Sequence, residues 1–331
     1  MLKRLTFLVI AAALGWSAWW YWGASQLRGS YEDWFAERRD DGWQAEYSDM
    51  KIRGFPNRHD TTWTNVQIVD PDSGLGWQAP FFQLFLLSYN RNHAIAVWPD
   101  TQSILTPDGR YEVASDSLQA SLITESSDHL LLRSNLAADV VNVTDPGGET
   151  TALAALRASI TRTEATIDSY DIALSVDGLA LSTPFLRAAE GAVPDTFQET
   201  RLQAQVTFDR PVSAESLSGD RPRPTALDLT LAELKWGPMG LRLTGEMEID
   251  GKGWIEGDLH IRAEDWREML RVARNSGEVP GGVIDGLEGL LGLLSQISGG
   301  GDNIGVDLRF DDRRTLLGPL PVGPAPRIEL R

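Results

Sequence analysis

The feature that most constrains this chain lies at its N-terminus, where Lys3 and Arg4 precede a run without a charge from Leu5 to Ala24. A helix of about twenty apolar residues is what a hydrocarbon core of roughly 30 Å requires. The run therefore predicts a membrane-spanning helix. The residues expected to form this anchor are Leu5, Phe7, Leu8, Val9, Ile10, Leu14, Trp16, Trp19, Trp20 and Trp22.

A cleaved signal peptide is the main alternative to an uncleaved anchor. A cut after Ala13 would leave too short an apolar region, and a cut after Ala18 or Ala24 would place Trp16 or Trp22 where a small side chain is needed. The anchor is therefore favoured. A buried core helix, the third reading, leaves the basic N-terminal flank and the aromatic end of the run unexplained.

The flanks of the run predict its orientation. Trp19, Trp20, Tyr21 and Trp22 gather at its far end, where amphipathic rings favour the headgroup boundary. Short basic flanks stay in the cytoplasm. We expect residues 1–24 to form a cytoplasmic tip and transmembrane anchor, and the rest of the chain to lie on the other side of the membrane.

Residues 25–42 are expected to continue the helix. Leu27, Tyr31, Trp34 and Phe35 recur at helical spacing opposite charged residues, and Gly42 is placed to end the helix in a left-handed conformation. The pattern predicts an amphipathic stalk, with docking on the following domain or lying in the membrane interface as alternatives.

Composition bounds the remaining domain, residues 43–331. A hydrophobic content of 42% offers enough apolar area for a large core. The absence of cysteine excludes disulfides, thiolate metal sites and thiol nucleophiles. A formal charge of −17 repels phosphate backbones, so no nucleic-acid partner is expected.

Alternating apolar and polar residues between turn signals predict a β-rich α+β fold. We expect a large, mostly antiparallel curved sheet, or a two-part β domain whose halves meet near residues 146–195, with a few short helices. The expected strands are 50–53, 61–69, 81–87, 94–98, 111–114, 118–123, 136–143, 170–181, 198–208, 226–236, 241–249, 254–261 and 304–310.

Three short helices are expected, at residues 150–158, 264–275 and 283–297. The third carries Gly286, Gly289 and Gly292 inside an apolar stripe. Because glycine weakens a helix, we expect these positions to serve close packing against a neighbour.

The clearest hairpin joins residues 241–249 to residues 254–261 through the turn Asp250-Gly251-Lys252-Gly253. Its alternation predicts one buried and one wet face. The apolar side chains form a candidate ligand face made of Leu241, Leu243, Met247, Ile255, Leu259 and Ile261.

Motifs for catalysis, cofactors or metals are absent from the sequence, and no enzymatic activity is expected. His59 beside Asp60 is the most suggestive pair, but neighbouring strand residues point to opposite faces. The oxygen-rich segment Asp70-Pro71-Asp72-Ser73-Gly74 reads as a turn rather than a calcium loop.

Several segments carry a resemblance: Gly54-Phe55-Pro56-Asn57-Arg58, Ala79-Pro80-Phe81-Phe82-Gln83, His93 to Pro99, Asp265-Trp266-Arg267 and the ending from Leu317 to Pro324. They resemble an uncharacterised domain-of-unknown-function family of single-span envelope proteins from alphaproteobacteria. The resemblance implies an inner-membrane anchor, a cytoplasmic N-terminus and a periplasmic domain. It brings no catalytic residue and no substrate.

More loosely, the anchor, the Gly-Phe-Pro turn and the segments Leu243-Thr244-Gly245 and Gly257-Asp258-Leu259 are similar to AsmA-type envelope proteins. Their long curved sheets are associated with lipid homeostasis between membranes. A domain as short as this one could at most shield one acyl chain or act near one leaflet, and would not bridge two membranes.

Three functions follow in decreasing order of support. The first is a non-enzymatic envelope module that handles lipid or supports envelope assembly, with inner-membrane lipids as its partners. The second is a periplasmic scaffold that docks envelope proteins through its acidic surface and the proline-rich ending at residues 320–326. The third is a hydrolase whose site is assembled from distant residues.

Overall fold

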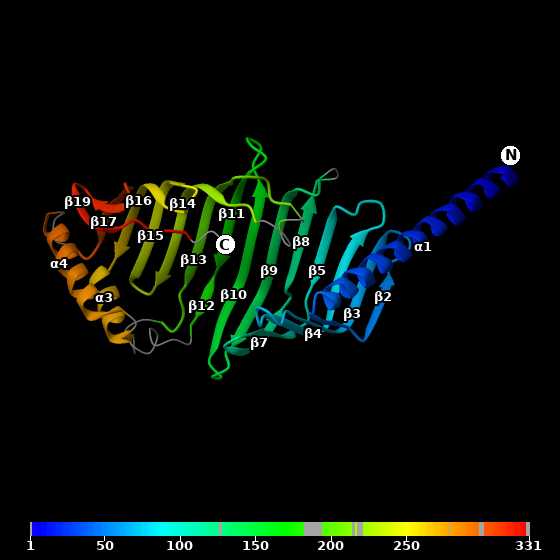
Figure 1. Cartoon of the computed structure of the whole chain (residues 1–331), viewed down its shortest axis with the longest axis horizontal. Coiled ribbons are helices and arrows are strands. Elements are labelled where there is room, and N and C mark those ends of the chain that lie inside the picture. The colour runs from blue at the N-terminus through cyan, green and yellow to red at the C-terminus, as the bar shows by residue number, and fades with distance from the viewer. Residues whose placement is uncertain are drawn as a thin grey trace. The chain divides into compact units, whose positions relative to one another are not determined.

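The computed structural model describes residues 2–125, 128–181, 194–213, 216, 221–277, 279–297 and 301–328. These residues form one long N-terminal helix, nineteen strands that pair antiparallel and two shorter helices (Figure 1). The expected β-rich fold with an apolar N-terminal helix is confirmed. The chain divides into unit 1, Met1–Ser126 with Leu136–Glu149, and unit 2, Ser127–Asn135 with Thr150–Arg331.

Helix α1 runs without a break from Leu2 to Asp40. In the part of the chain that the structure describes, it is the one helix long and apolar enough to cross a membrane, with a mean hydropathy of 1.3 over its best window. It ends where expected, because Gly42 takes a positive φ of 90° and its N–H donates to Arg39 O at 3.0 Å.

Unit 1 is built on two long strands, β3 (Arg58–Val69) and β4 (Gly76–Leu87), which pair along most of their length. On one side, β1 (Gln44–Glu46) and β2 (Asp49–Arg53) pair with β3; on the other, β5 (His93–Val97) and β6 (Thr101–Thr106) pair with β4. The further strands are β7 (Gly109–Asp116), β8 (Gln119–Thr124) and, from Leu136 onward, β9 (Leu131–Thr144).

The second half of α1 packs on this sheet. Phe35 is buried with Ala45, Met50, Trp63 and Val66 in one apolar cluster. The guanidinium groups of Arg28 and Arg39 donate to the backbone oxygens of Met50 and Ala45 at 3.1 and 3.0 Å. Residues 25–40 therefore lie along the β-sheet of unit 1, the docked arrangement of the expected stalk.

Unit 2 is an antiparallel sheet in which most successive strands are neighbours. The described strands are β10 (Thr150–Arg162), β11 (Ser169–Val176), β12 (Gly178–Ala180), β13 (Glu199–Phe208), β14 (Pro224–Trp236), β15 (Met239–Ile249), β16 (Ile255–Glu264), β17 (Ile304–Asp311), β18 (Arg314–Leu317) and β19 (Leu320–Pro324). Helices α3 (Trp266–Ser276) and α4 (Gly281–Ile297) lie between β16 and β17 in sequence.

The helix expected at residues 150–158 is wrong, because this segment is the first part of β10. Its alanines favour a helix when considered alone. In the folded chain, Ala152–Ala154 pair with β12 and residues 157–162 pair with β11, with Ala155 at a positive φ of 52° between the two stretches. Pairing with two strands outweighs a weak local preference.

The proline-rich ending is also part of the sheet. Leu320–Pro324 forms β19 and pairs with β18, and the charged residues Asp311 to Arg314 close the tight β17–β18 turn. Asp312 and Arg313 both take positive φ, the geometry that matches the twist of a two-residue hairpin.

Candidate apolar ligand site

The β15–β16 hairpin has one apolar and one polar face, as its alternation predicts. Leu243 lies opposite Ile261 and Gly245 opposite Leu259, so the side chains of Leu243, Ile261 and Leu259 share a face. Arg242 and Glu246 point to the other face and are exposed. The apolar face continues onto β17 through Val306 and Leu308, which pair with Ile261 and Leu259.

Helices α3 and α4 cover one end of this face (Figure 1). Trp266, at the start of α3, is buried with Ala263 of β16 and Ile304 of β17. On the exposed side of the helices, Arg274 of α3 pairs with Asp285 and Glu288 of α4 at 2.7 and 2.8 Å. These ion pairs link the two helices on their solvent-exposed side.

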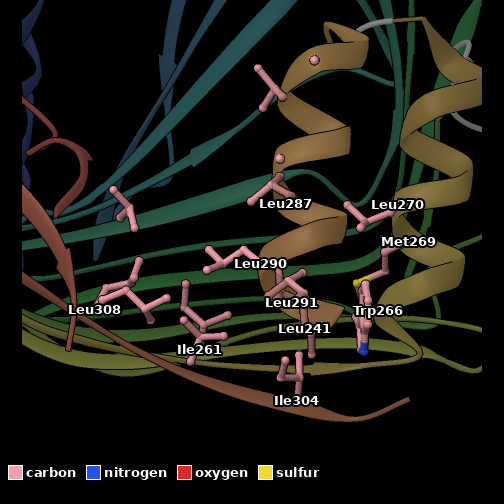
Figure 2. A pocket seen from close by; sticks show the side chains of 17 residues that line it. Leu241, Ile261, Trp266, Met269, Leu270, Leu287, Leu290, Leu291, Ile304 and Leu308 are labelled. Carbon is pink, nitrogen blue, oxygen red and sulfur yellow. The ribbon is translucent and has the colours of Figure 1, made fainter. Parts of the chain in front are cut away.

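A cavity of about 630 Å³ remains between the helices and the sheet. Figure 2 shows Leu290 and Leu291 of α4 lying near Ile261 and Leu241 of the sheet, with Trp266, Met269 and Leu270 of α3 beside them. The full lining is Leu241, Ile261, Ala263, Trp266, Met269, Leu270, Gly282, Val283, Gly286, Leu287, Leu290, Leu291, Ile304, Val306, Leu308, Leu317 and Val322.

The lining decides what this cavity can do. It contains no ionisable side chain, so it offers neither an acid or base nor a carboxylate or imidazole metal ligand. A volume in the range of roughly 300–1,000 Å³ suits a small ligand. At about 30 Å³ for a group the size of water, the cavity holds about twenty such groups, the scale of a single acyl chain.

Helix α4 leaves the cavity accessible. Val283 and Leu287 line it and are 52% and 40% exposed, while Leu293 on another part of the helix is 62% exposed. A Cβ added at Gly286, Gly289 or Gly292 would meet nothing within 4 Å. The expectation that these glycines serve close packing is therefore wrong, since open space lies beside each of them.

The six residues of the predicted ligand face separate into two groups. Leu241 and Ile261 line the cavity. Leu243, Met247, Ile255 and Leu259 lie in a packed cluster around Leu229, Phe310 and Ala325. The alternation locates the apolar face, but the two covering helices determine which part of it stays open.

The lining residues from α3 and α4 are absent from the predicted site. Their signal is present in the sequence, because Trp266, Met269 and Leu270 form the apolar stripe of one helix and Leu287, Leu290 and Leu291 that of the next. Nothing in either stripe indicates which strands the helices cover.

A second, smaller cavity of about 200 Å³ lies in unit 1, between α1 and the β3–β4 pair. Its lining is apolar and mostly aromatic: Tyr31, Trp34, Phe35, Trp63, Val66, Ile68, Trp77 and Phe82. Its size leaves room for only part of an acyl chain.

His59 and Asp60, the pair considered for catalysis, have separate partners in the described part of the chain. His59 is 1% exposed; its Nε2 lies 3.2 Å from Trp20 O, and its Nδ1 has no hydrogen-bond partner among the described residues. Asp60 pairs instead with Arg58 at 2.8 Å. Adjacent positions on β3 thus keep Asp60 from orienting His59.

The segment beginning at Asp70 is a closed turn. The carboxylate of Asp70 accepts from Asp72 N at 2.9 Å and from Ser73 Oγ at 2.6 Å. Burial is slight here, and the hydrogen bond from Ser73 holds the pKa of Asp70 below its usual value. Within the described ranges, no group of three His, Asp or Glu side chains could hold a metal ion.

The predicted anchor residues are mostly exposed on α1. Trp20 is buried, with 4% of its surface exposed. The exposed anchor residues are Leu5, Phe7, Leu8, Val9, Ile10 and Leu14. Trp16, Trp19 and Trp22 stay largely exposed beside Trp20.

Comparison with known protein families assigns the chain to one of them. A family model described as an uncharacterized protein conserved in bacteria, DUF2125, matches residues 20–326. The chain belongs to this family. The DUF2125 match covers α1 from Trp20 and both β-rich units, including every residue of the cavity lining. Neither a curated protein nor a solved structure matches the chain significantly.

Proposed function

We propose that this DUF2125 protein is a membrane-anchored envelope protein, without enzymatic activity, that holds one acyl chain of a lipid between α3, α4 and strands β15–β17. The observation that carries the proposal is the cavity of about 630 Å³ lined only by apolar residues. An apolar chain gains by leaving water for such a site, at about 0.8 kcal/mol for each methylene group buried.

The composition of α4 supports a lipid ligand over a polar one. Its charged residues are Asp285 and Glu288, both engaged by Arg274, while leucines lie both on the cavity side and at exposed positions such as Leu293. A helix that is apolar on several sides suits a lipid environment better than water.

The N-terminal helix also supports a location at the membrane. Helix α1 has the length and composition to cross a bilayer, and its basic flank favours an N-terminus in the cytoplasm. The proposed location is the inner membrane, with residues 43–331 in the periplasm and membrane lipids as partners.

Native mass spectrometry of the full-length chain tests the acyl-chain site. The protein, purified in detergent, is incubated with vesicles of phosphatidylethanolamine and phosphatidylglycerol, and lipid adducts are then counted. Gly286→Leu places a bulky side chain in the cavity, because Gly286 lines it and nothing lies within 4 Å of a Cβ added there. Gly289→Leu is the matched control, since it makes the same change on the same helix outside the lining.

We expect one adduct in the parent chain and in Gly289→Leu, and its loss in Gly286→Leu. Both variants keep α1, so lipids held by the anchor contribute equally. Equal adducts in all three chains would exclude this cavity as the site. A parent chain that stays free of lipid would favour a protein scaffold, to be tested next by capture of partner proteins.

A further inference from the structure

The loop between β2 and β3, residues 54–57, is bound to the part of α1 that the sequence assigns to the membrane. The indole Nε1 of Trp16 donates to Pro56 O at 2.9 Å, and that of Trp20 donates to Arg58 O at 2.7 Å. The ring of Trp20 also stacks on His59, with ring centroids 5.1 Å apart.

The contact continues one turn further along α1. A Cβ added at Gly23 would lie 3.1 Å from Arg91 Nη2 and 3.2 Å from His59 Cε1, so a side chain here would have to displace Arg91 or His59 slightly. The helix is therefore held against the start of β3 from Trp16 onward. All described residues before Ser17 are exposed.

The free part of the helix is too short to cross a bilayer. From Leu5 to Gly15 it has eleven residues, which at 1.5 Å each cover about 16 Å. The hydrocarbon core is roughly 30 Å thick, which leaves about 14 Å, or about nine residues, to be supplied by residues 16–24. The residues that complete the span are thus the ones that hold the loop.

The loop itself is suited to this depth. Phe55 is 50% exposed, lies 5.6 Å from the ring of Trp20 and stacks at 6.3 Å on Tyr21. Phe55, Pro56 and Asn57 carry no charge, and exposed Trp19 and Trp22 lie on the same stretch of helix. Aromatic side chains in such a cluster favour the membrane interface.

We infer that residues 54–57 lie in the periplasmic leaflet, with Phe55 at the depth of Trp20 and Tyr21, inside the boundary between headgroups and acyl chains. Unit 1 then stands directly on the membrane. This inference rests on the proposed anchor. The partner surface is the leaflet of the bilayer that α1 itself spans.

Strand β3 fixes the expected depth of the rest of unit 1. It runs beside α1 away from the loop, from His59 near Trp20 to Trp63 near Tyr31, with ring centroids of the last pair 4.8 Å apart. At about 3.3 Å per residue, the far end of β3 lies some 35 Å beyond the loop. Asp72 in the turn after β3 should therefore remain in water.

Single-cysteine labelling tests this geometry cleanly, because the chain has no cysteine. Nitroxide labels are placed at Phe55→Cys, Asn57→Cys, Asp72→Cys and Leu8→Cys of the full chain, in vesicles of phosphatidylethanolamine and phosphatidylglycerol. Collisions with oxygen, which enters the bilayer, and with a water-soluble nickel chelate report the depth of each label.

We expect positions 55 and 57 each to favour oxygen over nickel by at least several-fold relative to position 72. If nickel reaches positions 55 and 57 as readily as position 72 while position 8 is protected, the inference is wrong and the anchor still stands. Nickel access at position 8 as well would overturn the anchor itself.

Discussion

At the scale of single residues, Gly257 shows how closely the backbones of β15 and β16 approach each other. It pairs with Met247 at a positive φ of 137°, and a Cβ there would fall on the carbonyl oxygen of Glu246. We expect Gly257→Ala to lower the free energy of unfolding by about 2 kcal/mol, from backbone strain and overlap.

Gly305→Ala on neighbouring β17 is the matched control for this substitution. Nothing lies within 4 Å of its added Cβ, so a change within about 0.5 kcal/mol is expected. Urea unfolding followed by circular dichroism compares the two variants. Equal stability of both would show that the hairpin relaxes to accept the methyl group at position 257.

His59 predicts a pH dependence. Burial lowers its pKa below the usual value, and the nearby positive charge of Arg91 adds to this, against the opposing hydrogen bond with Trp20 O. Unfolded chains then bind a proton below about pH 6.5 while the folded chain does not. The contribution of neutral His59 to the free energy of unfolding is therefore fully present above about pH 6.5 and is lost as the pH falls below it.

The variant His59→Phe keeps an aromatic ring against Trp20 and removes the titration. Between about pH 7.5 and 5.5 we expect the parent to lose stability more steeply than the variant, by at most the slope of one proton, about 1.4 kcal/mol per pH unit. Thermal unfolding in detergent measures both slopes. Identical slopes would show that His59 does not control this transition.

At the scale of elements, we expect opposite effects on stability from one glycine substitution in α4 and one at the end of α3. Gly289→Ala sits in open space in the helix interior and should stabilise α4 by about 0.5–1 kcal/mol. Gly277→Ala should destabilise α3, because Gly277 ends this helix with a left-handed φ of 72°. Hydrogen exchange of residues 266–297 measures both; a Gly289→Ala chain with unchanged or faster exchange in α4 would contradict this account.

Elements with a local signal are predictable from this sequence, and their partners are not. The β15–β16 hairpin and α3 follow from alternation and from the cap at Gly277. The alanines of β10 favour a helix locally, and only pairing with β11 and β12 makes them a strand. Of the cavity lining, the sequence predicted Leu241 and Ile261 alone, because the covering helices are brought in by tertiary contacts.

At the scale of the whole molecule, the contacts of α1 predict that the N-terminal helix is retained. Cleavage after Ala24 would remove Trp20, which stacks on His59 and donates to Arg58 O, and would uncover a residue that is 1% exposed. A chain produced in a Gram-negative host should therefore keep its N-terminus, remain in the membrane fraction after carbonate washing, and show the full mass of 36.5 kDa plus its C-terminal tag.

Residues 43–331 behind a cleavable periplasmic signal provide the control, because this product must be processed if secretion and tagging work. Intact mass and N-terminal sequencing then separate the two cases. An N-terminus near Ser25 with release from the membrane would exclude the anchor, and with it the placement of Phe55 in the leaflet. The acyl-chain cavity would remain testable, since its lining lies entirely within residues 241–322.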